Sequence, residues 1–263
     1  MFVMNRTVED TELSDQELLR YSRQIMLPQI DMAGQQKLLA SHVLLFGVGG
    51  LGSLVAMYLV TSGIGKITIV DPDRVDLSNL QRQVIFRSDQ IGDEKVSSAK
   101  QVLAALNERV TVRTINSRLT GSELRNEVAN ANLVVDATDN FSARFAINVA
   151  CVETRTPLVV GAAIRFEGQV IVFTMRDESA CYQCLYPDQG DLEERCTQTG
   201  ILGSVAGLVG CIQATEAIKL LLQIGETLSN KMLLVDALNM EWHGVKINRD
   251  PKCAVCANSN NHA

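Results

Sequence analysis

Two pairs of cysteines are the residues of this chain whose spacing points most directly to chemistry. Cys181 and Cys184 form one C-x-x-C pair, and Cys253 and Cys256 form another. Two-residue spacing lets both sulfurs of a turn reach one ion, and two such turns complete a tetrahedral Cys₄ zinc site. Because four thiolates leave no coordination position open, we expect a structural zinc ion that fixes the C-terminal region to the body. A redox-active C-x-x-C motif is the alternative, but it would not explain the second pair.

A glycine-rich turn is the second feature of this kind. Gly47, Gly49 and Gly52 fit the pattern G-x-G-x-x-G, in which backbone N–H groups and a helix N-terminus face phosphates. Asp71 ends the next apolar run, nineteen residues after Gly52, and an acid at that place suits a ribose hydroxyl. The pattern predicts a bound nucleotide. It does not distinguish NAD, FAD and ATP, and a tight turn without a ligand stays open as an alternative.

Charged residues beside the turn narrow the choice of nucleotide. Arg82 and Lys95 follow the second predicted strand, and Asp139 follows the fourth. Cations together with a carboxylate that can hold Mg²⁺ suit a triphosphate undergoing phosphoryl or nucleotidyl transfer. The sequence has no G-x-x-x-x-G-K-[ST] motif, so a P-loop NTPase is excluded. An NAD- or FAD-dependent oxidoreductase and a catalytically silent scaffold remain alternatives, although both leave these three residues unexplained.

Strands and helices alternate over the first part of the chain and must position these residues. A helix at 15–26, opened by a capping box from Ser14 to Glu17, and a second helix at 32–39 come before the first strand. The alternation predicts an α/β fold with a doubly wound, mostly parallel, Rossmann-like sheet and ligands at the carboxyl ends of the strands. The expected strands are 43–46, 66–70, 110–115, 133–135 and 157–161, and the expected helices are 53–62, 94–107, 122–129 and 141–153.

The pattern changes after the fifth strand. Residues 168–175 alternate and have no crossover helix before the cysteines, so we expect an antiparallel strand, followed by turns over 177–200. A long apolar helix at 203–224 and strands at 231–235 and 242–247 complete the chain. We therefore expect one domain over 1–263, in which antiparallel strands continue the sheet. Its parts are an N-terminal helical arm (1–41), a nucleotide-binding half (42–165) and an antiparallel, zinc-binding half (166–263).

The composition indicates a soluble globular protein, with 46% hydrophobic and 21% charged residues. The net charge of -6 disfavours binding to nucleic acid. The N-terminus is polar and acidic, which is unlike an export signal, and no apolar run reaches membrane-spanning length. Seven cysteines without an export signal indicate a reducing compartment. We expect a cytoplasmic protein that has no membrane partner.

Three cysteines and two arginines lie outside these motifs. Cys151 and Cys211 occur in apolar helical segments and are expected in the core, whereas Cys196 occurs in a polar loop. Cys196 is either an exposed thiol or an ordinary loop residue. Arg20 and Arg23 are one turn apart on the first helix, so they share a face that spacing alone assigns to solvent.

Several motifs occur together in one order. These are Arg20-Tyr21-Ser22-Arg23-Gln24, the glycine turn 47–52, Ser78-Asn79-Leu80-Gln81-Arg82-Gln83, Asp136-Ala137-Thr138-Asp139-Asn140, Gly161-Ala162-Ala163-Ile164 and both C-x-x-C pairs. In this combination the chain resembles the MoeB/ThiF/HesA family, the bacterial relatives of ubiquitin-activating E1 enzymes, from about Leu13 to Cys256. Within the family it looks closest to the molybdopterin-synthase adenylyltransferases. The enzymes that activate the thiamin sulfur carrier are similar at nearly all the same positions.

The resemblance implies a reaction and its site residues. Members adenylate the C-terminal glycine of a ubiquitin-like sulfur carrier with ATP and Mg²⁺, which releases pyrophosphate. It implies catalytic roles for Arg23, Arg82, Lys95 and Asp139, with Asp139 on Mg²⁺. It also implies nucleotide contacts from Gly47, Gly49, Gly50, Gly52, Asp71, Asp73, Ser78, Asn79, Leu80, Gln81, Arg82, Lys95, Asp139 and Asn140.

The resemblance also implies partners. Arg23 resembles an arginine that reaches ATP from the neighbouring subunit, so we expect a homodimer. The sequence stops soon after Cys256 without a rhodanese-like region, so we expect a separate sulfurtransferase to supply the sulfur. Cys196 matches a loop cysteine that takes part in sulfur transfer in some members and is dispensable in others.

Overall fold

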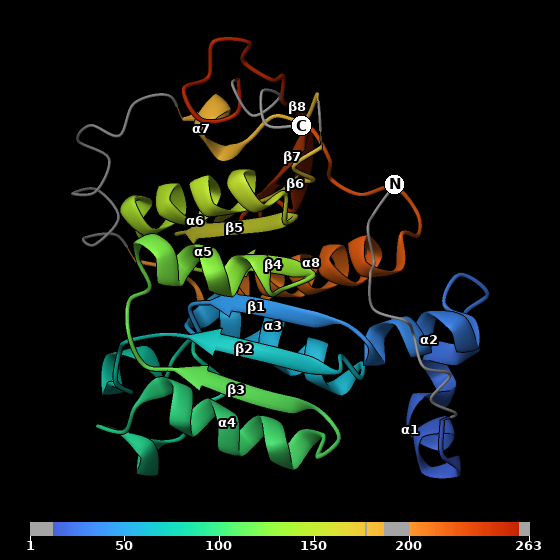
Figure 1. The fold of residues 1–263 in the computed structure, drawn as a ribbon. Helices are drawn as coiled ribbons and strands as arrows, with labels where there is room; N and C mark the ends of the chain where they lie inside the picture. Colours follow the sequence, from blue (N-terminus) through green and yellow to red (C-terminus); the bar gives the residue numbers. More distant parts are fainter. Residues whose placement is uncertain (1–12, 177, 187–199, 258–263) are drawn as a thin grey trace.

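A single eight-stranded sheet forms the centre of the computed structural model, which describes residues 13–176, 178–186 and 200–257. The strand order is β3-β2-β1-β4-β5-β6-β7-β8 (Figure 1). The first five strands in this order are parallel, and β6, β7 and β8 continue the sheet antiparallel. The predicted α/β fold is thereby confirmed. The strands are β1 (His42–Phe46), β2 (Lys66–Val70), β3 (Thr111–Ile115), β4 (Leu133–Asp136), β5 (Leu158–Ile164), β6 (Glu167–Phe173), β7 (Lys231–Asp236) and β8 (Glu241–Lys246).

The helices and strands lie close to the predicted positions, with three main differences. The helix after the glycine turn begins three residues earlier than expected, β5 ends three residues later than expected, and a short helix occurs where only turns were expected. The helices are α1 (Asp15–Ile25), α2 (Asp31–Leu39), α3 (Gly50–Thr61), α4 (Lys95–Leu106), α5 (Gly121–Ala129), α6 (Phe141–Thr154), α7 (Tyr182–Leu185) and α8 (Gly203–Leu222). Two 3₁₀ turns, η1 (Leu77–Asn79) and η2 (Ser88–Gln90), precede α4.

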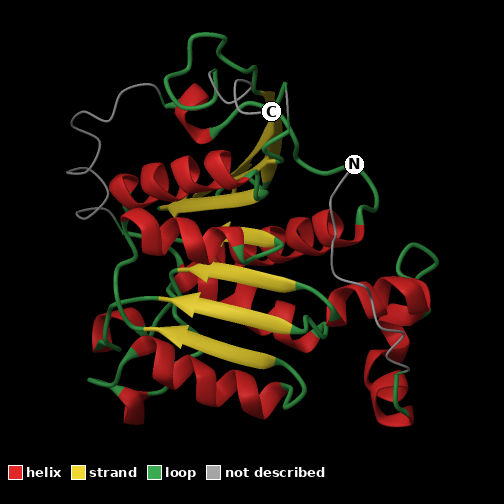
Figure 2. Ribbon diagram, viewed as in Figure 1, coloured by secondary structure: helices red, strands yellow, loops and turns green. Residues whose placement is uncertain are grey.

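Helices cover both faces of the sheet (Figure 2). Alternate residues of β1 enter two separate cores, because successive side chains of a strand point to opposite faces. Val43 and Leu45 pack with α3, α4 and α8, whereas Leu44 and Phe46 pack with α5, α6 and α7. Burial on both faces explains why the parallel strands read as continuous apolar runs.

Helix α8 corrects one expectation from the sequence. With 20 residues and a mean hydropathy of 1.6, it is long and apolar enough to cross a membrane, contrary to the expectation that no run reaches that length. In the fold it packs against α3, β4, β5 and β6, and residues such as Val209 and Ala217 are fully buried. Its apolar character is therefore that of a core helix.

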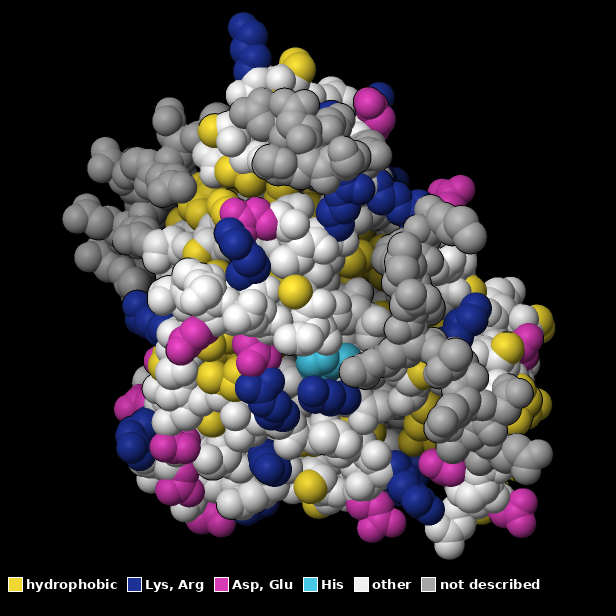
Figure 3. All heavy atoms as spheres, in the orientation of Figure 1, with side chains coloured by type: hydrophobic (Ala, Val, Ile, Leu, Met, Phe, Trp, Pro, Cys, Tyr) yellow, Lys and Arg dark blue, Asp and Glu magenta, His cyan; other side chains and the backbone are white. Residues whose placement is uncertain are grey.

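Charge is mixed on the face of the molecule shown in Figure 3. Basic and acidic side chains are interspersed over the described residues of that face, and apolar side chains lie between them. Neither sign of charge therefore dominates the described part of this face.

Candidate functional site

The glycine turn connects β1 to α3 at the edge where the parallel strands end, which we call the carboxyl edge. Gly47 has a φ of +81°, and a Cβ on it would lie 2.9 Å from the carbonyl oxygen of Ala137. A Cβ on Gly52 would collide with the carbonyl oxygen of Gly47, so both positions require glycine. This close approach lets α3 begin at Gly50. The N–H groups of its first turn lack helical acceptors and are therefore available to phosphates.

Asp71 joins this turn to the end of β2. Its Oδ2 accepts a hydrogen bond from the backbone N–H of Val48 at 2.9 Å, and its Oδ1 accepts one from the N–H of Asp73 at 2.9 Å. Burial raises the pKa of the Asp71 carboxyl group, and the nearby Lys95 ammonium opposes that rise. Each carboxylate oxygen retains a further lone pair. The side chain thus stabilises the turn and can still accept a hydrogen bond from a ribose hydroxyl.

Lys95 is the first residue of α4 and is only 5% exposed. Its Nζ donates to Oδ2 of Asp73 at 2.9 Å, and its backbone N–H donates to the carbonyl oxygen of the same residue. Because α4 begins at the carboxyl edge after β2, the structure brings Lys95 to the same edge as the glycine turn. A buried ammonium is held there beside two carboxylates, Asp71 and Asp73.

Arg82 lies over the start of α3. Its NH1 donates to the carbonyl oxygen of Ser78 at 3.0 Å, and a Cβ on Gly50 would lie 3.4 Å from its Cγ. The turn η1 positions this segment, and Oδ1 of Asp76 caps it by accepting from the N–H of Ser78. The guanidinium is therefore anchored close to the first helical turn that the glycines expose.

The other residues predicted in this segment have different surroundings. Ser78 and Gln81 are exposed, and Asn79 is half-buried, with its Nδ2 donating to Oγ of Ser78 at 3.2 Å. Leu80 packs against the apolar core, which makes it a packing residue in this conformation.

The loop after β4 presents Asp139 at the same edge. Phe46 of β1 pairs with Asp136 of β4, so the glycine turn and this loop follow neighbouring strands. Asp139 is exposed, while the next residue, Asn140, caps α6 by accepting the N–H of Ala143 at 2.9 Å. Burial raises the pKa of the Asp136 carboxyl group, whose Oδ1 accepts from the N–H and hydroxyl of Thr138. Asp136 is fully buried, whereas Asp139 is exposed and fits a magnesium ion shared with phosphates.

Arg23 is the predicted site residue that the described chain does not bring to this edge. Helix α1 packs against the far ends of α3 and α4, where Arg20 NH1 donates to the carbonyl oxygen of Leu106 at 3.0 Å. Tyr21 OH accepts from Nδ2 of Asn107, just past α4, at 2.9 Å. In Figure 1, α1 lies beside the edge where β1, β2 and β3 begin, opposite the arrowheads. The exposed Arg23 side chain therefore lies across the molecule from the glycine turn of its own chain.

The four paired cysteines meet in one cluster. The sulfur atoms of Cys181 and Cys253 are 3.7 Å apart, those of Cys184 and Cys256 are 3.4 Å apart, and all four lie within 4.8 Å of one another. Zn–S bonds of about 2.3 Å in a tetrahedron place sulfurs about 3.8 Å apart, so the cluster fits zinc. A hydrogen bond from Cys181 lowers the pKa of the Cys184 thiol to about 4, which favours a thiolate ligand.

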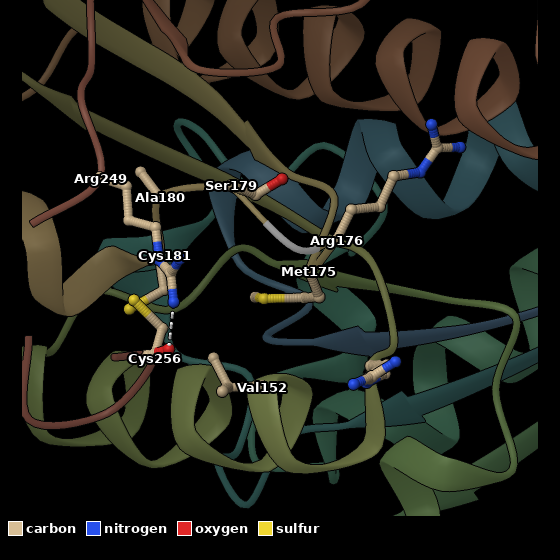
Figure 4. A pocket seen from close by; sticks show the side chains of 9 residues that line it. Val152, Met175, Arg176, Ser179, Ala180, Cys181, Arg249 and Cys256 are labelled. Atoms are coloured by element: carbon tan, nitrogen blue, oxygen red, sulfur yellow. Dashed lines mark hydrogen bonds between the residues drawn. The ribbon is translucent and has the colours of Figure 1, made fainter. Parts of the chain in front are cut away.

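Polar groups around the cluster support the ligands. Nδ2 of Asn148 donates to Sγ of Cys181 at 3.6 Å, and the N–H of Asp250 donates to Sγ of Cys184 at 3.4 Å. Arg249 donates to the carbonyl oxygen of Cys256 at 2.7 Å, beside a small pocket lined in part by Val152 and Met175 (Figure 4). The cluster therefore ties β6 and α7 to the C-terminal segment, as expected of a structural site.

The remaining cysteines divide as follows. Cys151 is fully buried, which confirms its predicted place in the core. Cys211 is only half-buried on α8, so the prediction was wrong in placing it fully inside. Cys196 lies outside the described residues.

Sequence reasoning missed the buried polar residues behind the Asp139 loop. Arg144 on α6 donates to the carbonyl oxygen of Thr138 at 2.6 Å, and Gln213 on α8 donates to that of Asp136 at 2.8 Å. A glutamine directly after the apolar run from Val205 to Ile212 was the available signal for Gln213. Arg144 gave no such signal, because a cation on a helix usually faces solvent.

Comparisons with known proteins find relatives over nearly the whole chain. The model of the ThiF family matches residues 21–255. A molybdopterin-synthase adenylyltransferase of Salmonella typhimurium is 42% identical over 245 residues, which cover 93% of this chain and 98% of the relative. A sulfur carrier protein ThiS adenylyltransferase of Escherichia coli is 43% identical over 248 residues, which cover 94% and 98%. The crystal structure of E. coli MccB with ATP has a TM-score of 0.78 at 26% identity, covering 90% of this chain and 74% of that chain.

Proposed function

This chain belongs to the ThiF family of adenylyltransferases, and from that premise we propose that it adenylates the C-terminal glycine of a ubiquitin-like sulfur carrier. The carrier is the small subunit of molybdopterin synthase, and the thiamin sulfur carrier is the alternative. The observation that supports the proposal best is that Lys95, Arg82 and Asp139 lie on segments at the carboxyl edge of the sheet, where α3 also begins. An NAD or FAD enzyme needs the glycine turn but not these three residues.

The proposed reaction is one displacement at the α-phosphorus of ATP. A carboxylate oxygen of the carrier's last residue attacks, the bond to the bridging oxygen breaks, and pyrophosphate leaves with that electron pair. The products are an acyl-adenylate and pyrophosphate. No covalent bond to the protein is required, so the site acts by positioning the reactants and neutralising charge.

Each polar or charged group of the site has its own proposed role in this reaction. The free N–H groups at the start of α3 would bind phosphate oxygens, and Lys95 and Arg82 would offset the charge that develops on pyrophosphate. Asp139 and the phosphates would hold Mg²⁺, which supplies further neutralisation of the triphosphate. Asp71 would bind the ribose, and Asn140, at the start of α6, would line the nucleotide site.

Arg23 would complete the site from a second subunit. Support comes from the position of α1 against the ends of α3 and α4 that lie farthest from the glycine turn. Helix α3 has 12 residues, so about 18 Å separates its two ends. Leu19 on α1 and Met26, which caps the end of α1, are 78% and 71% exposed, and exposed apolar side chains of this kind suit contact with another copy of the chain. We therefore include a homodimer in the proposal.

The further parts of the proposal concern zinc, sulfur and location. The Cys₄ cluster would hold one zinc ion that stabilises the fold and takes no part in adenylation. Sulfur delivery by a separate sulfurtransferase, a role for Cys196 and a cytoplasmic location remain predictions from the sequence.

Carrier-dependent exchange of pyrophosphate into ATP tests this function. The purified protein is given ATP, Mg²⁺ and labelled pyrophosphate, with each of the two carriers in turn. We expect exchange with one carrier and none with the same carrier lacking its terminal glycine, since the attacking carboxylate is then displaced. A protein that binds a carrier but exchanges no label with either one would be a scaffold, contrary to the proposal.

A further inference from the structure

The loop between β4 and α6 is fixed by hydrogen bonds from three directions. Gln213 Nε2 donates to the carbonyl oxygen of Asp136 at 2.8 Å, and Oδ1 of Asp136 accepts from the backbone and hydroxyl of Thr138 at 2.9 and 2.7 Å. NH2 of Arg144 donates to the carbonyl oxygen of Thr138 at 2.6 Å. Asp139 follows directly, and its carboxylate is exposed. The backbone on the N-terminal side of this carboxylate thus has little freedom to move.

Arg144 occupies an unusual place for a cation. It is 6% exposed, and it also donates to the carbonyl oxygen of Gly161 at 3.2 Å. Its guanidinium lies 5.8 Å from the centroid of the Phe141 ring and interacts electrostatically with the fully buried Asp136. Two buried groups of opposite charge usually add little net stability, because desolvation cancels most of the attraction. The position of Arg144 is therefore better explained by its hydrogen bond to the loop than by a gain in the stability of the fold.

Gln213 holds the same loop from the other face of the sheet. Its side chain is fully buried, and its amide fills the space that a Cβ on Gly161 would need. The glycine in β5 therefore allows α8 to bring an amide to the end of β4. Arg144 and Gln213 come from helices on opposite faces of the sheet and act on carbonyl groups two residues apart.

We propose that Arg144 and Gln213 are positioning residues, which fix the Thr138–Asp139 segment so that the Asp139 carboxylate is preorganised for the magnesium ion of MgATP. The inference rests on the proposed function and deepens it. A carboxylate held in place loses little entropy when it binds a metal, whereas a loose one must be ordered first. Misplacement of a catalytic group by about 1 Å can cost about a hundredfold in rate.

Two conservative variants test the inference. Gln213→Met keeps the side-chain length but removes the donor to Asp136, and Arg144→Lys keeps the charge but removes the forked guanidinium. Thr156→Val is a matched control. It removes a buried hydroxyl that donates to the carbonyl oxygen of Val128 near the start of β5, at the opposite edge of the sheet. All three should lower the unfolding temperature by a few degrees.

The readout is ATP affinity measured by calorimetry with and without Mg²⁺. The ratio of the two affinities reports how well Asp139 engages the metal. We expect this ratio to fall about tenfold in Gln213→Met and in Arg144→Lys, with little change in metal-free affinity because Lys95 and Arg82 are intact. Thr156→Val should keep the wild-type ratio. Adding Asp139→Asn should abolish the effect of the other two substitutions, since coupled residues are not additive.

Two outcomes separate this inference from the proposed function. Wild-type ratios in both variants, with stability lowered as in the control, would show that the two residues serve only the fold. Wild-type protein that exchanges no pyrophosphate would refute adenylation, yet the magnesium-dependent affinity ratios would still show whether the two residues position Asp139.

Discussion

Restoration of activity by mixing two inactive variants tests the placement of Arg23 in a neighbouring subunit. Arg23→Ala removes the guanidinium, and Asp139→Asn removes the carboxylate that we propose binds the metal, with almost no change in size. In the proposed homodimer, each variant then lacks one group at both sites. An arginine that acts on a transferring phosphoryl group contributes about 10³-fold or more to the rate, so neither variant alone should show measurable exchange.

The structure determines what the mixture should do. Helix α1, which carries Arg23, contacts the end of α3 through a hydrogen bond from Gln24 to the carbonyl oxygen of Ser62. The glycine turn lies at the other end of this 12-residue helix, about 18 Å away, so we expect that one chain does not supply both groups to one site. In a mixed dimer, one site combines the intact Arg23 of one chain with the intact Asp139 of the other. Random exchange makes about half of the dimers mixed, with one working site in two, so about a quarter of wild-type activity should return.

The assay is pyrophosphate exchange after equal amounts of the two variants are incubated together. Subunit exchange is checked separately with chains that carry different affinity tags. If mixed dimers form and activity stays at the level of the single variants, Arg23 does not act across the interface, and the reasoning from the position of α1 is refuted.

Three further predictions concern the metal sites and pH. Asp139→Asn should unfold at the wild-type temperature but lose pyrophosphate exchange by orders of magnitude, and near-normal exchange at ordinary magnesium concentrations would refute its role. Elemental analysis of Cys253→Ser should show about one zinc ion per chain less than the wild type, and the free energy of unfolding should fall by several kcal/mol. A zinc-free wild-type protein with four reactive thiols would contradict this prediction. Burial lowers the pKa of His42, so the unfolded state takes up a proton at a higher pH than the folded state does, and stability falls as the pH drops below about 6.5. The decline in urea stability between about pH 6.5 and 5 should be shallower in His42→Gln, and an unchanged slope in that variant would contradict the assignment.

Local patterns predicted much of the site. The glycine turn, the strand before it and the acid that ends the next strand are all encoded within short stretches of sequence. Lys95 was found because α4 must begin at the carboxyl edge when strands and helices alternate. The cysteine pairs, 72 positions apart, were matched by their equal spacing, and the fold brings their sulfurs together.

Interactions between distant segments could not be predicted in the same way. Gln213 binds a carbonyl group 77 positions earlier, and nothing near either residue indicates that contact. The buried charge of Arg144 depends on Asp136 and Gly161, which come from two different strands. Helix α8 was expected as a long apolar helix at 203–224, but not as one of membrane-spanning length; its two charged residues, Glu216 and Lys219, form an ion pair with each other. Burial and pairing decide these features, and both require the assembled sheet.

The mass of the sulfur carrier after reaction with ATP tests adenylation most directly. The protein, MgATP and the full-length carrier are incubated with inorganic pyrophosphatase and quenched in acid. The mass of the intact carrier is then measured by mass spectrometry. The account predicts that the carrier gains one AMP at its C-terminal glycine, with label retained from the α-phosphate and lost from the γ-phosphate. An unmodified carrier, or one that gains a phosphoryl group from the γ-position, would contradict it.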